Sequence, residues 1–167
     1  EVYNRALSAA EIAGIHTAGS GGQCGCSTAP DDMFAWYEGE GNANDSIGSS
    51  HGTLENGTTF SPGLVGQAFS FDGVDDRVVI PHNANQNPGT GFTVDAWIKQ
   101  DTLGHGRPVA QKRTSGNVGG YTFETMHSPF GPDGSMHFAL MIGGTYRFAN
   151  TPGNVLQTGV WQHVAAT

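Results

Sequence analysis

The stretch that decides the fold is FTVDAWIK, residues 92–99, in which an apolar side chain recurs at every second position. Successive side chains of an extended strand point to opposite faces, so this two-residue period collects the apolar residues on one face. The stretch therefore predicts a β-strand with a continuous apolar face. That face holds Phe92, Val94, Ala96 and Ile98, and the opposite face holds Thr93, Asp95, Trp97 and Lys99.

The same period recurs on both sides of this strand. The clearest second example is Met136–Ile142, where four apolar residues alternate with other side chains. Shorter runs of this kind occur at residues 33–37, 53–60, 67–72, 78–80, 121–123 and 161–167, and around Val109. About nine or ten short strands separated by turns are typical of an all-β sandwich or jelly roll.

Two local signals predict hairpin turns between these runs. Asn56-Gly57 is a favoured two-residue hairpin loop, and it lies between Thr53-Leu54 and residues 58–60. The acidic stretch Asp72–Asp76, DGVDD, begins with the Asp-Gly turn signal and precedes Val78. We expect a hairpin at each position.

Composition and charge exclude several classes of protein. The chain has 167 residues, of which 26 are Gly, 13% are charged and 37% are hydrophobic, a mixture unlike that of disordered chains or helical bundles. Seven Lys and Arg against fifteen Asp and Glu give a net charge of −8, which repels phosphate backbones and argues against nucleic-acid binding. No apolar stretch reaches the roughly 18 residues of a membrane span, so membrane insertion is not expected.

The first residues predict a short helix followed by a linker. Ser8 and Glu11 match the S-x-x-E capping box, in which each side chain satisfies a backbone amide of the other residue. Residues 18–32 are small and polar with no periodicity, as in a linker. This stretch contains Cys24 and Cys26, which are one residue apart and poorly placed for a mutual disulfide, so their pairing stays open.

Several motifs together resemble a known family. Residues 34–81 (FAWYEGEG to RVVIP), FTVDAWIKQ at 92–100 and WQHVAAT at 161–167 follow one another as in bacterial laminin-G-like modules of the concanavalin-A-like superfamily. The opening EVYNRALSAAEIAGI looks like the closing motif of the same kind of module. The resemblance implies a concanavalin-A-like jelly-roll β-sandwich with a short N-terminal helix.

The order of these motifs predicts the domain organisation. We expect residues 1–17 to be the closing strand and helix of a preceding copy, 18–32 the linker, and 33–167 a laminin-G-like sandwich that is incomplete at its C-terminus. Neighbouring copies of the module are then partners in a tandem array. We also expect the N-terminal strand to pair with an open sheet edge, because edge strands invite such pairing.

Motifs for catalysis are weak in this sequence. Residues 48–52, GSSHG, match G-x-S-x-G, but their flanks are loop-like, whereas a nucleophile elbow joins a strand to a helix. Glycosidases need two carboxylates across the sugar, and the E-x-D-x-E run of glucan-cleaving relatives of this fold is absent. We therefore predict that the chain is not an enzyme.

A calcium site and a sugar site are the remaining candidates. The resemblance implies a structural calcium in many such modules, and Asp45, with His51 in the same loop, occupies the position of the family's opening-loop acid. Stacking on sugars requires exposed aromatic rings, for which Trp97, Tyr121 and Tyr146 are the candidates. Trp97 lies opposite the apolar face of its strand, so it points outward or is covered by a loop.

The expected function is extracellular or cell-surface recognition of a carbohydrate or a cell-surface protein. Repetition of the module would raise the overall affinity of weak individual sites. The alternatives are a structural spacer in a large adhesin and an accessory domain of a multidomain glycoside hydrolase.

Overall fold

The computed structural model of the chain describes residues 2–3, 5–18, 32–87, 91–113, 119–142 and 144–167. The chain forms two compact units, residues 1–93 together with Thr167, and residues 94–166. The predicted linker, with Cys24 and Cys26, lies almost wholly outside the described residues. None of the helices in the described segments is long and apolar enough to cross a membrane.

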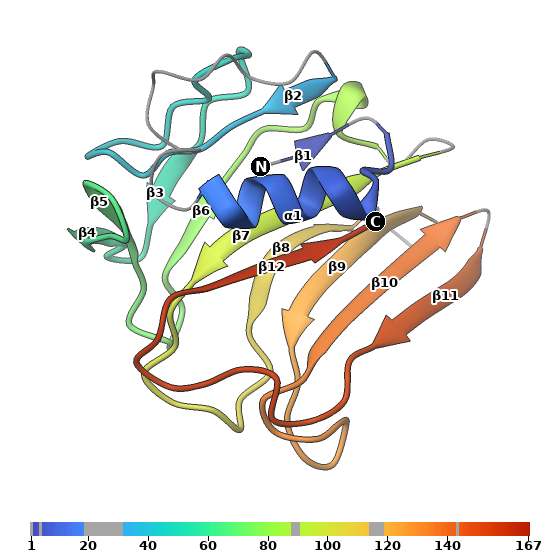
Figure 1. The fold of residues 1–167 in the computed structure, drawn as a ribbon. Coiled ribbons are helices and arrows are strands. Elements are labelled where there is room, and N and C mark those ends of the chain that lie inside the picture. The colour runs from blue at the N-terminus through green and yellow to red at the C-terminus, as the bar shows by residue number, and fades with distance from the viewer. Residues whose placement is uncertain (1, 4, 19–31, 88–90, 114–118, 143) are drawn as a thin grey trace. The chain divides into compact units, whose positions relative to one another are not determined.

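Residues 94–166 are built around a four-stranded antiparallel sheet with the strand order β11-β10-β9-β8 (Figure 1). Its strands are β8 (Pro108–Arg113), β9 (Gly119–Thr125), β10 (Met136–Ile142) and β11 (Thr145–Asn150). A second antiparallel pair joins β7 (Thr93–Ile98) to β12 (Gln162–Ala166), with Val164 opposite Ala96. These six strands include the stretches at 92–99, 136–142 and 161–167 whose two-residue period predicted them.

The core of this unit is formed by the apolar side chains that alternate along its strands and share one face. Phe123 in β9 and Phe138 in β10 are opposite each other, and their rings meet edge to face with centroids 6.1 Å apart. Val94 in β7 and Val164 in β12 are buried as well. Burial of an apolar side chain of this size stabilises the folded state by about 1.5–3 kcal/mol, so the apolar faces hold the strands in register.

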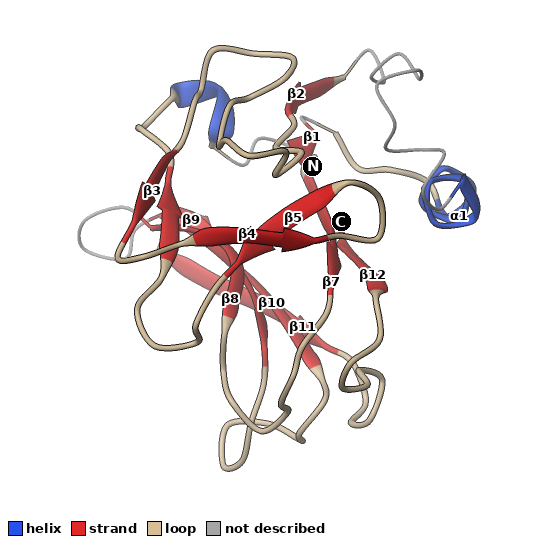
Figure 2. Ribbon diagram, turned by 90° about the vertical axis from the view of Figure 1, so that its left-hand side faces the viewer, coloured by secondary structure: helices blue, strands red, loops and turns tan. Residues whose placement is uncertain are grey.

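Residues 1–93 contain two strand pairs, one nested inside the other. The outer pair is β3 (Thr53–Glu55) with β6 (Arg77–Val79), and the inner pair is β4 (Thr59–Pro62) with β5 (Gln67–Ser70). Figure 2 shows the two strands of the inner pair, β4 and β5, next to each other. A 3₁₀ turn, Ala84–Gln86, follows β6.

This nesting corrects the expected hairpin at Asn56-Gly57. Both residues have positive φ, 59° and 104°, as the turn signal predicts, and the Thr58 amide donates to the Glu55 carbonyl at 3.3 Å. The strands on either side, however, do not pair with each other. The acidic turn at Asp72–Asp76 likewise connects β5 to β6, which belong to different pairs. Both turns therefore stand where the chain changes from one pair to the other.

The N-terminal segment is docked within its unit. Strand β1 (Val2–Tyr3) pairs antiparallel with β2 (Met33–Ala35). The hydroxyl of Thr93 accepts from the Leu7 amide at 2.9 Å and donates to the Arg5 carbonyl at 2.8 Å, and Leu7 is buried. The segment is thus paired with a strand of its own unit, whereas its expected pairing with a sheet edge left open by a C-terminal truncation stays a prediction. Its origin in a preceding copy stays a prediction.

Helix α1 (Ala9–Ala18) begins as the capping box predicts. The Ser8 amide donates to the Glu11 carboxylate at 2.8 Å, and the Glu11 amide donates to the Ser8 hydroxyl at 3.3 Å. Arg5 also donates to Glu11 and to Asp32, each at 2.6 Å. The hydrogen bond from Arg5, followed by those from Ser8, lowers the pKa of Glu11 to about 2.

Candidate functional site

One face of the four-stranded sheet is lined by polar and aromatic side chains, and we call it the polar face. Because side chains alternate along each strand and the register is fixed across the sheet, these residues lie on one side. The opposite side carries the buried Phe123. The polar face consists of Gln111, Arg113, Thr122, Glu124, His137, Tyr146, Phe148 and Asn150.

His137 is the centre of a hydrogen-bonded group on this face. Its side chain is held from both ends by β11, with Nδ1 2.6 Å from the Asn150 side-chain oxygen and Nε2 2.9 Å from the Tyr146 hydroxyl. The rings of Tyr146 and Phe148 pack over the imidazole, with centroids 6.4 Å and 5.8 Å away. His137 is only 8% exposed, and Thr122 and Ala139 on the same face are buried as well.

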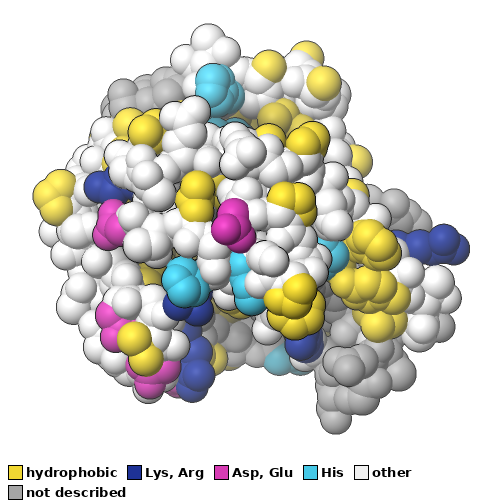
Figure 3. All heavy atoms as spheres, turned by 90° about the horizontal axis from the view of Figure 1, so that it is seen from below, with side chains coloured by type: hydrophobic (Ala, Val, Ile, Leu, Met, Phe, Trp, Pro, Cys, Tyr) yellow, Lys and Arg dark blue, Asp and Glu magenta, His cyan; other side chains and the backbone are white. Residues whose placement is uncertain are grey.

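The two aromatic rings of β11 are available to a ligand. Tyr146 is 52% exposed and Phe148 is 62% exposed, and their centroids are 5.6 Å apart. Figure 3, a view from below, shows hydrophobic side chains gathered at the right-hand side, where Figure 1 has β10 and β11. Exposed rings beside hydrogen-bonding groups suit ligands that have one apolar face and polar edges.

Beside these rings lies a hollow of about 180 Å³. Its lining includes Arg113, Glu124, His137 and Tyr146. Two successive glycines at the start of β9 leave part of this surface without side chains. Gly120 has φ of 122°, and a Cβ at that position would collide with the Lys112 carbonyl oxygen, so the backbone there admits no larger residue.

Two of the predicted sugar-binding aromatics are not exposed platforms. Tyr121 is 9% exposed and shares the buried side of β9 with Phe123, and its burial raises the pKa of its hydroxyl to about 12. Trp97 is half-buried, with its ring 5.4 Å from that of His163. Next to it, His163 and Asp95 form a buried pair 3.0 Å apart. Trp97 is therefore largely covered, which was one of the two possibilities left by the sequence.

Tyr146 is the predicted aromatic that the structure leaves open to solvent. The sequence interpretation did not single out its partners His137, Phe148 and Asn150. The sequence does contain a weak signal for a strand here, since Tyr146 and Phe148 alternate with polar residues. What brings the four together is the β10–β11 register, with His137 opposite Asn150 and Ala139 opposite Phe148, which no local pattern specifies.

The predicted metal residues Asp45 and His51 do lie together, but their ligand atoms are engaged. The Asp45 carboxylate is 4% exposed and accepts from four backbone amides. These amides belong to Trp36, Ile47, Gly48 and Ser50, at 3.0–3.3 Å. His51 uses Nδ1 to accept from the Asp45 amide at 3.2 Å.

The bonds to the Asp45 carboxylate involve mainly Oδ1, which accepts three of the four amides, and calcium binding by Asp45 and His51 stays a prediction. Amides that point at a carboxylate compete for the lone pairs that a cation would use. The Asp45 carboxylate also orders residues 45–50 as a compact loop. Ser50, the serine of the GSSHG motif, is part of that loop, and its hydroxyl accepts from Asn83 at 3.1 Å.

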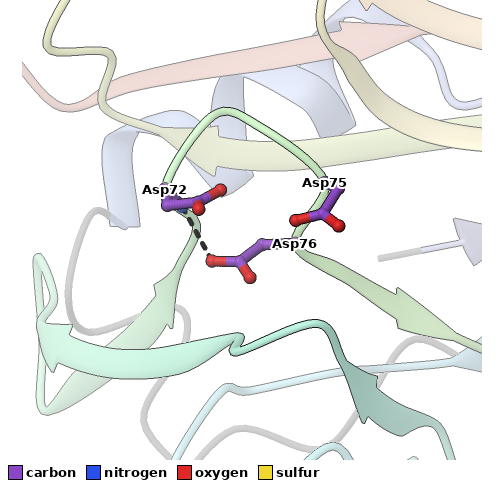
Figure 4. Close-up of side chains that lie close together, drawn as sticks. All are labelled: Asp72, Asp75 and Asp76. Atoms are coloured by element: carbon purple, nitrogen blue, oxygen red, sulfur yellow. Dashed lines mark hydrogen bonds between the residues drawn. The ribbon is translucent and has the colours of Figure 1, made fainter.

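A second group of carboxylates lies in the turn between β5 and β6. Oxygen atoms of Asp72, Asp75 and Asp76 fall within 4.8 Å of one another (Figure 4). The carboxylates also order the turn itself, because Asp76 accepts from the Asp72 amide at 2.8 Å and Asp72 accepts from the Val74 amide at 2.7 Å. Exposed acidic groups of this kind are common without an ion.

Charge is divided unevenly between the two units. Residues 94–166 hold five of the seven Lys and Arg residues but four of the fifteen Asp and Glu residues, for a net charge of +1. The remaining residues carry −9. The polar face thus belongs to the part of the chain that does not repel anions.

The comparisons with known proteins agree with the strand architecture. A family model described as the concanavalin A-like lectin/glucanases superfamily, of the laminin-G type, matches residues 72–167, from the acidic turn through β12. No curated protein and no solved structure matches the chain. The matched segment is more than half of the sequence and contains the whole polar face, and its all-β, antiparallel construction is that expected of a jelly-roll sandwich. The chain therefore belongs to the concanavalin A-like lectin/glucanase superfamily.

Proposed function

We propose that the chain is a non-catalytic carbohydrate-binding module and that the polar face of β8–β11 is its binding surface. The observation that carries the proposal is the pair of exposed rings, Tyr146 and Phe148, packed on a hydrogen-bonded His137 beside a hollow. Aromatic faces stack on the apolar faces of sugar rings, and neighbouring polar side chains bond the hydroxyl groups.

The charged groups in the hollow favour binding over hydrolysis. Glycoside hydrolysis requires two carboxyl groups about 5–9.5 Å apart on either side of the scissile bond. Among the described residues that line the hollow, Glu124 is the one with a carboxylate. Asp95, in β7, is buried against His163 and engaged by it. We therefore infer that a glycan on this face is held and released without cleavage.

The setting of the proposal is recognition outside the cell. Ligands of this kind are glycans or glycan-bearing proteins of a cell surface. Neighbouring copies of the module would add their affinities, since linked sites act at a high effective concentration. A spacer role predicts instead that the exposed rings of β11 have no ligand.

The test is glycan-array binding followed by calorimetry, with whole-chain variants. Tyr146→Ala and Phe148→Ala should each weaken binding by about tenfold, which corresponds to about 1.4 kcal/mol. The matched control is Phe71→Ala, because Phe71 is as exposed as Tyr146, at 51%, but lies outside the polar face. Absence of binding to any glycan would favour the spacer, and shortening of the bound glycan would show catalysis.

A further inference from the structure

The hydrogen bonds of His137 determine what Tyr146 can offer to a ligand. The Asn150 side-chain oxygen, 2.6 Å from Nδ1, can only accept, so the Nδ1 atom carries the proton of the neutral ring. The bare Nε2 then accepts from the Tyr146 hydroxyl at 2.9 Å. A tyrosine hydroxyl has a single hydrogen, so Tyr146 presents only lone pairs to the hollow in this state.

Protonation of His137 reverses that hydrogen bond. Both ring nitrogens of an imidazolium donate, so Nε2–H now points at the Tyr146 oxygen, and the hydroxyl hydrogen must turn elsewhere. Tyr146 is about half exposed and lines the hollow, so its hydrogen is free to meet a ligand atom there. The same side chain changes from an acceptor to a donor when the histidine beneath it gains a proton.

The charged groups facing His137 are few. Glu124 on β9 lies directly opposite it, and Arg113 on β8 lines the same hollow. The other residues of β10 on this side, Ala139 and Met141, are uncharged. Arg113 pairs with Gly120 and Glu124 with Pro108, so these two charges are about 13 Å apart along the strands. The hollow therefore has a basic end and an acidic end.

Tyr146 starts from the same row of residues as Arg113, at the other edge of the sheet, and its hydroxyl reaches back to His137. Arg113, Gly120, Met141 and Tyr146 form one row across the four strands, and the glycine in that row leaves the space between the arginine and its neighbours open. A guanidinium binds a carboxylate through two parallel N–H donors. Arg113 and Tyr146 start from the two outer strands of the sheet, three inter-strand spacings or about 14 Å apart, so an extended ligand would meet them with different carboxylates. One carboxylate accepts from Arg113, and a second accepts from Tyr146 only when His137 is protonated.

We propose that the hollow binds a glycan bearing carboxylate groups, of the uronic-acid class, and that protonation of His137 strengthens this binding. The inference rests on the proposed carbohydrate-binding function and adds the ligand's charge and a pH response. Affinity should therefore be higher when His137 is protonated than when it is neutral. The net charge of +1 on residues 94–166 is consistent with an anionic ligand.

The experiment compares two trisaccharides that differ only at C6, α-1,4-linked trigalacturonate and galactotriose, by calorimetry with the whole chain at pH 5.5 and pH 8.0. Uronate carboxyl groups stay ionised at both pH values, because simple carboxyl groups titrate near pH 3.5. Trigalacturonate should bind about tenfold more tightly at pH 5.5 than at pH 8.0. Galactotriose should change by less than about twofold, as expected for neutral hydrogen bonds.

Three variants test which side-chain groups cause the pH response and the preference for trigalacturonate. Tyr146→Phe keeps the ring and removes the hydroxyl, so it should reduce the pH response while galactotriose still binds. His137→Gln should abolish the pH response. Arg113→Gln should remove the preference for trigalacturonate. Arg147→Gln is the control, since Arg147 is a cation on the same sheet that alternates to the other face of β11, opposite Leu140, and it should leave all four affinities unchanged.

The outcomes separate this inference from the function on which it rests. Equal affinity for both trisaccharides at both pH values would overturn the inference and leave the carbohydrate-binding function standing. A preference for trigalacturonate that does not change with pH would overturn the role of His137. Failure of the folded chain to bind either trisaccharide or any arrayed glycan would overturn the proposed function and the inference with it.

Discussion

The loop at residues 45–50 and the polar face of β8–β11 both contain buried polar side chains, but they differ in what those side chains bind. Asp45 accepts from four backbone amides, three in its own loop and one at Trp36. His137 binds two side chains, Tyr146 and Asn150, that are themselves exposed to solvent. A buried polar side chain that bonds only backbone amides maintains the fold. A buried polar side chain that bonds exposed side chains is coupled to a ligand that contacts those side chains.

The largest loss of stability is expected from removal of the Asp45 carboxylate, which accepts hydrogen bonds from backbone amides. Asp45→Ala leaves four amides without their acceptor. Two of these hydrogen bonds are buried, and each buried unsatisfied group costs about 1–3 kcal/mol, so the free energy of unfolding should fall by about 2–6 kcal/mol. Urea denaturation measures this loss, with Asp101→Ala as an exposed control. If the four hydrogen bonds account for the loss, it is the same in calcium and in chelator. A loss seen only in calcium would show that Asp45 is a metal ligand.

The second prediction separates two tyrosines on opposite faces of one sheet. Burial raises the pKa of Tyr121 to about 12, so the folded state resists its ionisation while the unfolded state ionises near pH 10. The stability that Tyr121 contributes is present below about pH 10 and is lost as the pH rises toward 12, by up to about 2–3 kcal/mol.

Denaturation at pH 9 and pH 11.5 measures this dependence. Tyr121→Phe should flatten it, and Tyr146→Phe, on the exposed face, should not. If both variants give the same alkaline slope as the native chain, Tyr121 is not buried in solution.

The third prediction tests how tightly the Asp45 loop closes. A Cβ on Gly48 would collide with the Asp45 carboxylate and lie 3.0 Å from the Phe34 carbonyl oxygen. Gly48→Ala should therefore lower the free energy of unfolding by about 2 kcal/mol. Gly14→Ala, in α1 with nothing within 4 Å, should instead raise it by about 0.5–1 kcal/mol. Equal effects of the two substitutions would contradict the packing of the loop.

The smallest effect on stability is expected on the polar face. Tyr146 lies on an edge strand whose six residues are all exposed, so Tyr146→Ala should change the free energy of unfolding by less than about 0.5 kcal/mol while it weakens glycan binding. Urea denaturation and calorimetry on the same preparation measure the two quantities. A large loss of stability would place Tyr146 in the core and remove the contrast between the two regions.

The sequence predicted the elements whose signals are local. The two-residue period located β7, β10 and β12, because that period reports which face of a strand is buried. The capping box located the start of α1. By contrast, β11 was not identified, because the alternation of Tyr146 and Phe148 with polar residues is too short to predict a strand whose six residues are all exposed.

Partner choice and orientation were harder to predict. Asn56-Gly57 does form its turn, yet β3 pairs with β6 and not with β4, because turn chemistry fixes the backbone angles and not the strand that comes alongside. Likewise, Tyr121 and Tyr146 are similar as residues, and only the register places one in the interior and the other beside His137. Of the candidate site, the sequence thus predicted one aromatic residue, Tyr146. It did not predict the neighbours of Tyr146, which are His137, Phe148 and Asn150.

The nested pairing of residues 53–79 has a consequence for engineering. The two ends of the β4–β5 hairpin are joined by hydrogen bonds that do not involve its turn at residues 63–66. The Asn56 side chain donates to the Asp75 carbonyl at 2.8 Å, and the Thr58 hydroxyl donates to the Arg77 carbonyl at 3.0 Å. We therefore expect the outer strands to keep their pairing when residues 63–66, which reverse the chain between β4 and β5, are exchanged for a foreign peptide. Residues 63–66 are thus the position at which we would insert a peptide for display on the surface.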